Sequence, residues 1–440
     1  MSATTASAAT TYKWSDSLCR ARALSTDDAQ GVVMSVTYKV DGADRVCGKT
    51  AASWQGIGHL VSDTGLQNCT VTPTMTQPLK GTHHAIHRFS RPSGCSTNVN
   101  VDLFFATGRD HPIIAVSYDT TNTTKPGDSR FPYGQLRFDG ASNDNNVVSG
   151  LAWGDTHKFR TTTALKELST TGWDYTATNT VPYDMMWIDN PDSEMGLVQT
   201  QTYVQQDAGG YDYGSAGTTK DYWGQTSAGG PLPHVTLWPY QLNQYSTPDG
   251  SDTSTPWTTS SKRFAWGTQS DAVGSTSYTG VDGTQRSGKP HFGYSLFLVL
   301  GKHSQAVTDG AVKQMETVQG TTLTAQTGTV VTQGPVGAGR TATKTYQPAG
   351  YNHVYSTWEV TAQSNQAVVT FTTPAAGLVD PILVVRSYDS GNDPSVAVDG
   401  VPLEAGSGFF ASRDSASKTL WITLMGNFAG AKVISVAPKP

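Results

Sequence analysis

Acidic and aromatic residues are concentrated between Trp173 and Tyr245. This segment contains twelve Trp or Tyr residues and eight Asp or Glu residues, but only one Lys or Arg, Lys220. Aromatic rings stack on the apolar faces of sugar rings, and a pair of carboxyl groups, one protonated and one ionised, can cleave a glycosidic bond. The segment is therefore typical of a surface that binds a glycan and hydrolyses it.

The run from Tyr183 to Gly196 places four carboxylates beside aromatic rings, directly before a predicted strand. Glu194 is the favoured catalytic residue, because a strand fixes its direction and an apolar neighbour would raise its pKa. Asp189 is a second catalytic candidate, and Trp187 is a candidate for substrate binding. An alternative stays open, since Asp-Asn-Pro-Asp-Ser is also the composition of an ordinary turn.

A second group of polar residues follows the tight turn at Gly154. Asp155 is a candidate for the second catalytic carboxylate, or it orients His157, which is also a catalytic candidate. Trp153 and Lys158 are candidates for substrate binding. The alternative is a strand with a solvated outer face.

Two loops of the middle segment offer rings and amides to a sugar. One is a Gly-rich stretch over 207–224, whose length favours a lid. The other, 231–245, has three prolines and is expected to be extended. The predicted substrate-binding residues here and in the preceding strand are Tyr203, Trp223, Trp238, Tyr240 and Gln241.

The histidines at 83, 84 and 87 raise the question of a metal ion. On a helix, His83 and His87 would share one face, but the nearby Pro78 and Gly81 favour a strand, where residues four apart are about 13 Å from each other. We therefore expect no metal ion and no cofactor, with a site that combines His84 and the distant His157 as the alternative that stays open. His84 is also a candidate for substrate binding. Half of the ten histidines lie between Lys80 and Arg160, which keeps a polysaccharide lyase open: such an enzyme uses a neutral His or Tyr as base and a cation beside a uronate.

Composition limits the class of protein. Charged residues make up 15% of the 440 residues and Gly numbers 45, a profile of β-structure with many turns. The net charge of -5, without a basic stripe, argues against nucleic acid as a partner. No apolar run approaches the roughly 20 residues of a membrane helix.

The four cysteines all lie in the first quarter of the chain, at Cys19, Cys47, Cys69 and Cys95. An even number at wide spacing predicts two disulfides in a secreted or periplasmic protein, with buried free thiols as the alternative. Residues 1–10 lack an apolar segment and are expected to form a flexible leader.

Short apolar and alternating runs predict strands along the whole chain. In the first part, the clearest predicted strands are 32–40, 99–105, 111–118, 135–138, 196–204 and 294–300. A helix is expected from Thr308, capped by Thr308 or Asp309, to a stop at Gly320. Beyond it, predicted strands at 355–360, 367–371, 382–385, 395–398 and 420–424 recur at the spacing of a small sandwich.

The predicted fold is all-β: a large antiparallel β-sandwich over 11–305, a linker helix over 306–320, and a small immunoglobulin-like β-sandwich over 321–440. This order of domains resembles an arrangement found among carbohydrate-active proteins with a so-called supersandwich. The resemblance implies a glycan ligand and transfers no residue role.

Three functions remain as hypotheses. The leading one is a secreted glycoside hydrolase that acts on a polysaccharide or oligosaccharide through a carboxylate pair. The others are a polysaccharide lyase and a non-catalytic glycan-binding or structural surface protein. The sequence leaves the oligomeric state open.

Overall fold

A computed structural model describes the side chains of residues 74–90, 100–117, 295–335, 337–341 and 343–440, and of most residues in 181–200. Elsewhere it describes the backbone of strands alone. The protein consists mostly of strands in several antiparallel sheets, so the all-β prediction is confirmed.

The largest sheet contains ten antiparallel strands. In spatial order these are β1 (Thr4–Thr5), β6 (Thr74–Lys80), β7 (His84–Ser90), β8 (Asn98–Ala106), β9 (Ile113–Asp119), β23 (His291–Gly301), β15 (Asp192–Gln199), β14 (Tyr183–Asp189), β11 (Gly150–Gly154) and β12 (Arg160–Thr162). The strands predicted at 99–105 and 111–118 correspond to β8 and β9, which pair in an antiparallel ladder. Part of the expected leader, β1, pairs with β6.

The central strands of this sheet are buried on both faces. In β23, Leu296, Leu298 and Leu300 point to one face and Phe297 and Val299 to the other, and each is less than a tenth exposed. Continuous apolar runs of this kind belong to a sheet that is covered on both sides. The sheet is therefore the middle layer of the fold.

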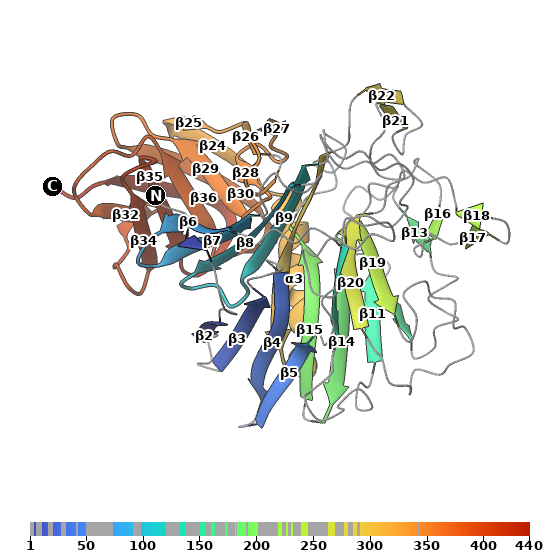
Figure 1. The fold of residues 1–440 in the computed structure, drawn as a ribbon. Coiled ribbons are helices and arrows are strands. Elements are labelled where there is room, and N and C mark those ends of the chain that lie inside the picture. The colour runs from blue at the N-terminus through green and yellow to red at the C-terminus, as the bar shows by residue number, and fades with distance from the viewer. Residues whose placement is uncertain are drawn as a thin grey trace.

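Smaller sheets contact one face of the ten-stranded sheet (Figure 1). One contains β2 (Thr11–Ser15), β3 (Ala21–Asp27), β4 (Val32–Val40) and β5 (Ala43–Lys49), and another contains β10 (Tyr133–Arg137), β20 (Arg263–Thr268) and β19 (Pro239–Gln244). Strand β4 contacts β23, and β19 and β20 contact β14. Three separate pairs are β13 (Gly172–Asp174) with β16 (Thr219–Asp221), β17 (Thr226–Ser227) with β18 (Gly230–Pro231), and β21 (Ser277–Thr279) with β22 (Gln285–Ser287).

The C-terminal part is a sandwich of two sheets. One contains β24 (Thr322–Thr327), β30 (Ala367–Val379), β36 (Asn427–Pro438), β32 (Pro394–Val398) and β33 (Val401–Pro402). The other contains β25 (Thr329–Val330), β28 (Tyr351–Asn352), β29 (Thr357–Thr361), β31 (Ile382–Arg386), β35 (Thr419–Leu424) and β34 (Phe409–Asp414), with β29 parallel to β31. A short hairpin joins β26 (Gln333–Pro335) to β27 (Thr343–Thr345). The five strands predicted for this part coincide with β29, β30, β31, β32 and β35.

The predicted helix is confirmed as α3 (Val307–Gln319), which follows the short 3-10 helix η3 (His303–Gln305). It packs against β15 and β23 on one side and β30 on the other, and Ala311, Val312, Met315 and Val318 are buried. These residues belong to one apolar cluster that runs from the ten-stranded sheet into the C-terminal sandwich. The helix expected as a linker is thus part of a shared core.

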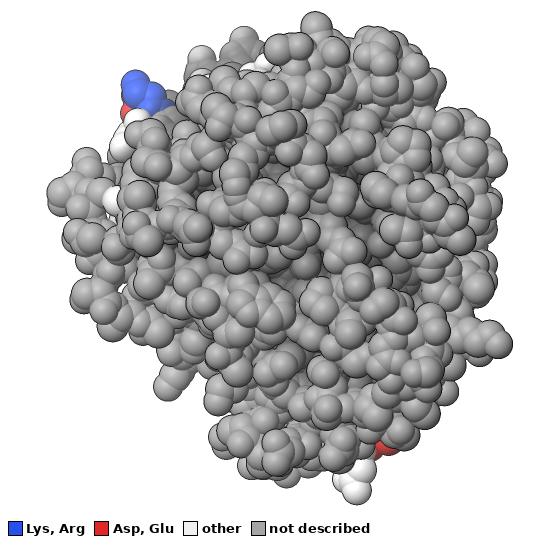
Figure 2. Space-filling view, turned by 45° about the vertical axis from the view of Figure 1, so that its right-hand side comes forward, with Lys and Arg blue, Asp and Glu red and all other residues white. Residues whose placement is uncertain are grey.

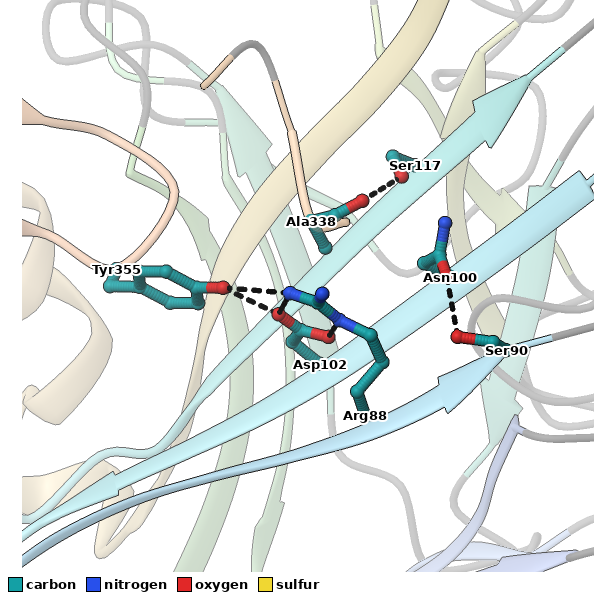
Figure 3. Close-up of polar contacts among 7 residues, drawn as sticks. All are labelled: Arg88, Ser90, Asn100, Asp102, Ser117, Ala338 and Tyr355. Carbon is teal, nitrogen blue, oxygen red and sulfur yellow. Dashed lines mark hydrogen bonds and ion pairs between the residues drawn. The ribbon is translucent and has the colours of Figure 1, made fainter. Parts of the chain in front are cut away.

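A buried polar network also joins the two parts (Figure 3). Arg88 of β7 donates from Nε and Nη2 to the two carboxylate oxygens of Asp102 of β8, at 2.7 Å each. The hydroxyl of Tyr355, from the C-terminal sandwich, donates to the same carboxylate. Burial opposes the charge of Arg88, but the interactions with Asp102 outweigh it and raise the pKa of the guanidinium. The network therefore keeps its charges paired inside the core.

Two neighbouring contacts extend this seam. The hydroxyl of Ser117 of β9 donates to the carbonyl oxygen of Ala338, and Ser90 donates to Asn100 at 2.6 Å across β7 and β8. Figure 3 shows Arg88, Ser90, Asn100, Asp102 and Ser117 on neighbouring strands, with Ala338 and Tyr355 approaching from the C-terminal part. A slippage of the sandwich on the sheet would break the contacts that Tyr355 and Ala338 make with it.

Replacing Asp102 by Asn should destabilise the protein by about 3 kcal/mol, because Arg88 would keep its charge without a buried counter-charge. Tyr355→Phe should cost less, about 1–2 kcal/mol, since only a hydroxyl is lost. Urea denaturation measures both. The control is Asp389→Asn, whose exposed pair with Lys418 should matter by less than about 1 kcal/mol. Equal effects at Asp102 and Asp389 would contradict the role of the network.

Candidate functional site

Glu194 lies inside the protein and holds the start of α3. Its side chain is 1% exposed. One carboxylate oxygen accepts the backbone N–H of Thr308 at 2.8 Å, and the other lies 2.6 Å from Nδ1 of His303. The residue before the helix, Ala306, has a φ of 48° and makes no side-chain cap. Glu194 therefore supplies, from β15, the acceptor that a capping side chain would normally provide.

The predicted cap at Thr308 or Asp309 is thus wrong, because the helix already begins at Val307 and its N-cap position is Ala306. Thr308 occupies the first turn, is buried, and donates its backbone N–H to Glu194. The position of Gly320 as the C-cap is confirmed. When the capping acceptor comes from a distant strand, it leaves no local pattern in the sequence.

Asp192 holds the same segment from the hairpin of β14 and β15. Its carboxylate accepts the backbone N–H of Ser304 at 3.0 Å and also the Ser304 hydroxyl. Desolvation would raise the pKa of Asp192, but the hydrogen bonds from Ser304 and His303 outweigh it and lower the pKa. Asp189 pairs with Asp192 across the two-residue turn and is exposed. Asp189 and Asp192 thus lie at the ends of the paired strands β14 and β15, but the carboxylate of Asp192 binds Ser304 instead of its own backbone, and the catalytic role of Asp189 stays a prediction.

Trp187 completes this cluster. Its ring stacks on the imidazole of His303, with centroids 4.4 Å apart and planes 7° apart. Trp187 and Glu194 are directly opposite each other on β14 and β15. The indole is half-buried and packs against the shared core. The predicted acid and its aromatic neighbour do lie together, in an arrangement that positions a helix.

Other predicted site residues lie outside the described residues. Nothing is described for Asp155, His157, Lys158, Tyr203, Trp223 and Trp238. For Trp153 in β11 and for Tyr240 and Gln241 in β19, the backbone alone is described. The cysteines also fall outside the described side chains. The roles assigned to these residues stay predictions.

A cavity of about 1100 Å³ lies where the ten-stranded sheet, α3 and the C-terminal sandwich meet. Its apolar wall includes Val307, Ala311, Met315 and Val318 of the helix. Aromatic rings at Phe105, Phe297, Trp358 and Phe410 also line it, and its polar lining includes His83, His84, Arg109, Asp110, His111 and Asp380. A mostly apolar hollow with a few convergent polar groups is the usual form of a ligand site.

His84 is part of the cavity wall, but its ring is fully engaged. Nδ1 lies 3.0 Å from the hydroxyl of Ser412, and Nε2 lies 2.9 Å from the hydroxyl of Thr423. Burial lowers the pKa of His84 to about 3, with smaller contributions from His83 and Arg109. Its predicted role in substrate binding stays a prediction, while the geometry favours a neutral bridge between the sheet and the sandwich. The neighbouring His83 is half-buried and lies 3.4 Å, Nδ1 to hydroxyl, from Thr107.

Two carboxylates line the cavity from opposite parts of the fold. Asp110 lies in the turn between β8 and β9, and Asp380 lies between β30 and β31. Burial raises the pKa of Asp380, and the charge of Asp110 adds to this effect. The N–H of Gly426, which donates to Asp380 at 2.7 Å, and Arg109 oppose it. An acid with a raised pKa beside a second carboxylate is the arrangement that proton-transfer chemistry uses.

Sequence reasoning missed this pair. Arg109 and Asp110 fall between the strands predicted at 99–105 and 111–118, and Asp380 falls between those predicted at 367–371 and 382–385. The signal in the first case was three polar residues, Arg109 to His111, in a single turn, which exceeds what a tight turn requires. Asp380 has no such signal, because its partner is 270 positions away in the sequence.

Among the residues that the structure describes, no group of three potential metal ligands occurs. In the same part of the chain, no helix has the length and apolar character needed to cross a membrane. On the face in Figure 2, described charged side chains reach the surface at separate points of the rim, some basic and some acidic, and form no continuous patch.

Replacing Glu194 by Gln should destabilise the protein by about 2 kcal/mol, because the helix start and His303 lose their charged acceptor. The control is Asp309→Asn, an exposed acid at the same helix start whose pair with Lys313 should contribute less than about 1 kcal/mol. Urea denaturation compares the two. A Glu194→Gln protein of unchanged stability that had lost cleavage of a glycan would restore the catalytic interpretation of this residue.

The pKa of His84 predicts a loss of stability in acid. The pKa of His84 is lowered from 6.5 to about 3 in the folded state. As the pH falls below 6.5, His84 therefore becomes protonated in the unfolded chain but stays neutral in the native protein. His84 should therefore lower the free energy of unfolding by about 2 kcal/mol between pH 7 and pH 5.

His84→Asn should remove this pH dependence, measured by urea denaturation at both pH values. Ser412→Ala, which weakens the same contacts without removing the titrating group, should lower stability similarly at pH 7 and pH 5. An unchanged slope in His84→Asn would show that other groups cause it.

Comparison with known proteins adds no assignment: no protein-family model matches the chain, and no curated protein matches it.

Proposed function

We propose that the protein is a glycoside hydrolase that binds a glycan in the cavity between the ten-stranded sheet, α3 and the C-terminal sandwich. The observation that carries this proposal is a carboxylate pair, Asp110 and Asp380, in one hollow lined by aromatic rings. Asp380 serves as the proton donor and Asp110 as the second acidic residue of the pair. The predicted secretion of the protein is part of the same proposal.

The raised pKa of Asp380 supports its role as the acid. A proton donor must still hold its proton at the working pH, and burial of Asp380 raises its pKa in that direction. Its proton passes to the glycosidic oxygen as the bond to the anomeric carbon breaks. The carboxylate of Asp110 either attacks that carbon or activates a water molecule.

The rings in the cavity suit the binding of sugars. Phe105 and Phe410 line it and are half-buried. Flat apolar rings of this kind stack on the C–H faces of sugar rings. The volume of about 1100 Å³ accommodates several sugar units.

A polysaccharide lyase is the second candidate. The observation in its favour is that a cation, Arg109, and an imidazole, His83, line the same cavity. In a β-elimination the imidazole accepts the proton next to a uronate carboxylate, and the leaving oxygen departs as a double bond forms. Such products absorb in the ultraviolet, whereas hydrolysis yields reducing ends alone.

The test is a screen of neutral and acidic polysaccharides, read by reducing ends and by ultraviolet absorbance. On any substrate that is cleaved, Asp380→Asn and Asp110→Asn should each lower the rate by about 100-fold or more. Activity of the unchanged protein should fall as the pH rises through the raised pKa of Asp380, because the acid is then deprotonated.

Asp399→Asn is the matched control. Asp399 also occupies a turn with positive φ and also accepts a backbone N–H, from Val433 at 2.9 Å, but it does not line the cavity. Full activity in the Asp380 and Asp110 variants would reject this pair. Binding without cleavage across the whole panel would instead favour a non-catalytic glycan-binding protein.

A further inference from the structure

Arg109 reaches the cavity from the turn between β8 and β9 and is held on two sides. Its Nε donates to the backbone carbonyl oxygen of Asp380 at 3.1 Å. Its guanidinium carbon lies 5.9 Å from the centre of the Phe297 ring. These contacts fix the plane of the guanidinium without using its terminal nitrogens.

The charge of Arg109 has no ion-pair partner among the described residues. The acceptor of its Nε is a neutral carbonyl, while the carboxylate of Asp380 accepts the N–H of Gly426 instead. By contrast, Arg88 binds the two oxygens of Asp102. The two arginines therefore differ: the charge of Arg88 is neutralised by Asp102, and the charge of Arg109 is left for another anion.

Burial makes this charge costly in the free protein. It lowers the pKa of Arg109 to about 10, against the opposing effects of Tyr351 and Asp380. An anion that entered the cavity would offset this cost, because a charge-assisted hydrogen bond strengthens where water is excluded.

The geometry selects the kind of anion. A guanidinium with a fixed plane offers its terminal N–H groups as a fork that matches the two oxygens of a carboxylate. The rings of Phe105 and Phe410 line the same hollow and suit the body of a sugar. We propose that Arg109 binds the carboxylate of a uronic acid unit, so that the substrate is an acidic glycan. This inference rests on the proposed function and names its substrate class.

The experiment compares uronate oligosaccharides with their carboxyl-reduced counterparts, using oligomers of galacturonate, glucuronate and mannuronate. Binding is measured by calorimetry, and cleavage by reducing ends and ultraviolet absorbance. For at least one pair, the unchanged protein should bind the acidic member about tenfold to a hundredfold more tightly.

Three variants test whether Arg109 causes the preference for the acidic oligomer. Arg109→Gln should abolish the preference, so that the acidic oligomer binds no more tightly than the reduced one. Arg109→Lys should restore part of the preference, since an ammonium keeps the charge but loses the fork. Lys313→Gln, which removes an exposed cation outside the cavity, should retain the full preference. If Arg109→Gln does not fold, the Lys variant and the paired ligands still decide.

The outcomes separate this inference from the proposed function. Cleavage or binding of the reduced oligomer equal to that of the acidic one overturns the inference and leaves the hydrolase intact. A sulfated galactan oligomer is measured alongside as a second anionic glycan. If it binds more tightly than any uronate oligomer, the anion that Arg109 binds is not a carboxylate. A preference for uronate that survives in Arg109→Gln overturns the role of Arg109. Binding of none of the oligomers overturns the inference together with the proposed function.

Discussion

The start of α3 depends on a carboxylate that comes from a distant strand. A helix leaves its first backbone N–H groups without partners inside the helix, and Ala306 has no side chain that could accept one. Glu194 of β15 accepts the N–H of Thr308, and Asp192 fixes Ser304 just before the helix. The orientation of α3 is thereby tied to the hairpin of β14 and β15.

This constraint reaches the cavity, because α3 forms one of its walls. Val307, Ala311, Met315 and Val318 face the hollow from successive turns of the helix. Glu194 holds the first turn of the helix through the Thr308 N–H, and the helix packs against β15, β23 and β30. The ten-stranded sheet, the helix and the sandwich therefore share a core, and the cavity lies in the seam between them.

Acids in this protein differ in their chemistry because of their surroundings. Asp192 is surrounded by donors, which lower its pKa. Burial, together with the charge of Asp110, raises the pKa of Asp380 against the opposing effects of the Gly426 N–H and Arg109. Histidines differ in the same way: His84 is a neutral bridge between two hydroxyls, whereas His303 pairs with Glu194 and stacks on Trp187. A residue type in a sequence pattern therefore indicates possible chemistry, and its partners decide which chemistry remains.

The sequence by itself determined the elements. Alternation and apolar runs predicted strands that coincide with β4, β8, β9, β23 and the central strands of the C-terminal sandwich, and periodicity predicted α3. These signals are local, because each depends on the spacing of neighbours along the chain. The pairing of Trp187 with Glu194 was within reach for the same reason, since a two-residue turn separates their strands.

Only the tertiary structure decided which acids hold a helix and which line a cavity. Asp110 and Asp380, like Arg88 and Tyr355, come from segments far apart in sequence, and packing of the sandwich on the sheet brings them together. Contacts at such separation leave no periodic trace, and the desolvation that sets a pKa depends on everything packed around the group.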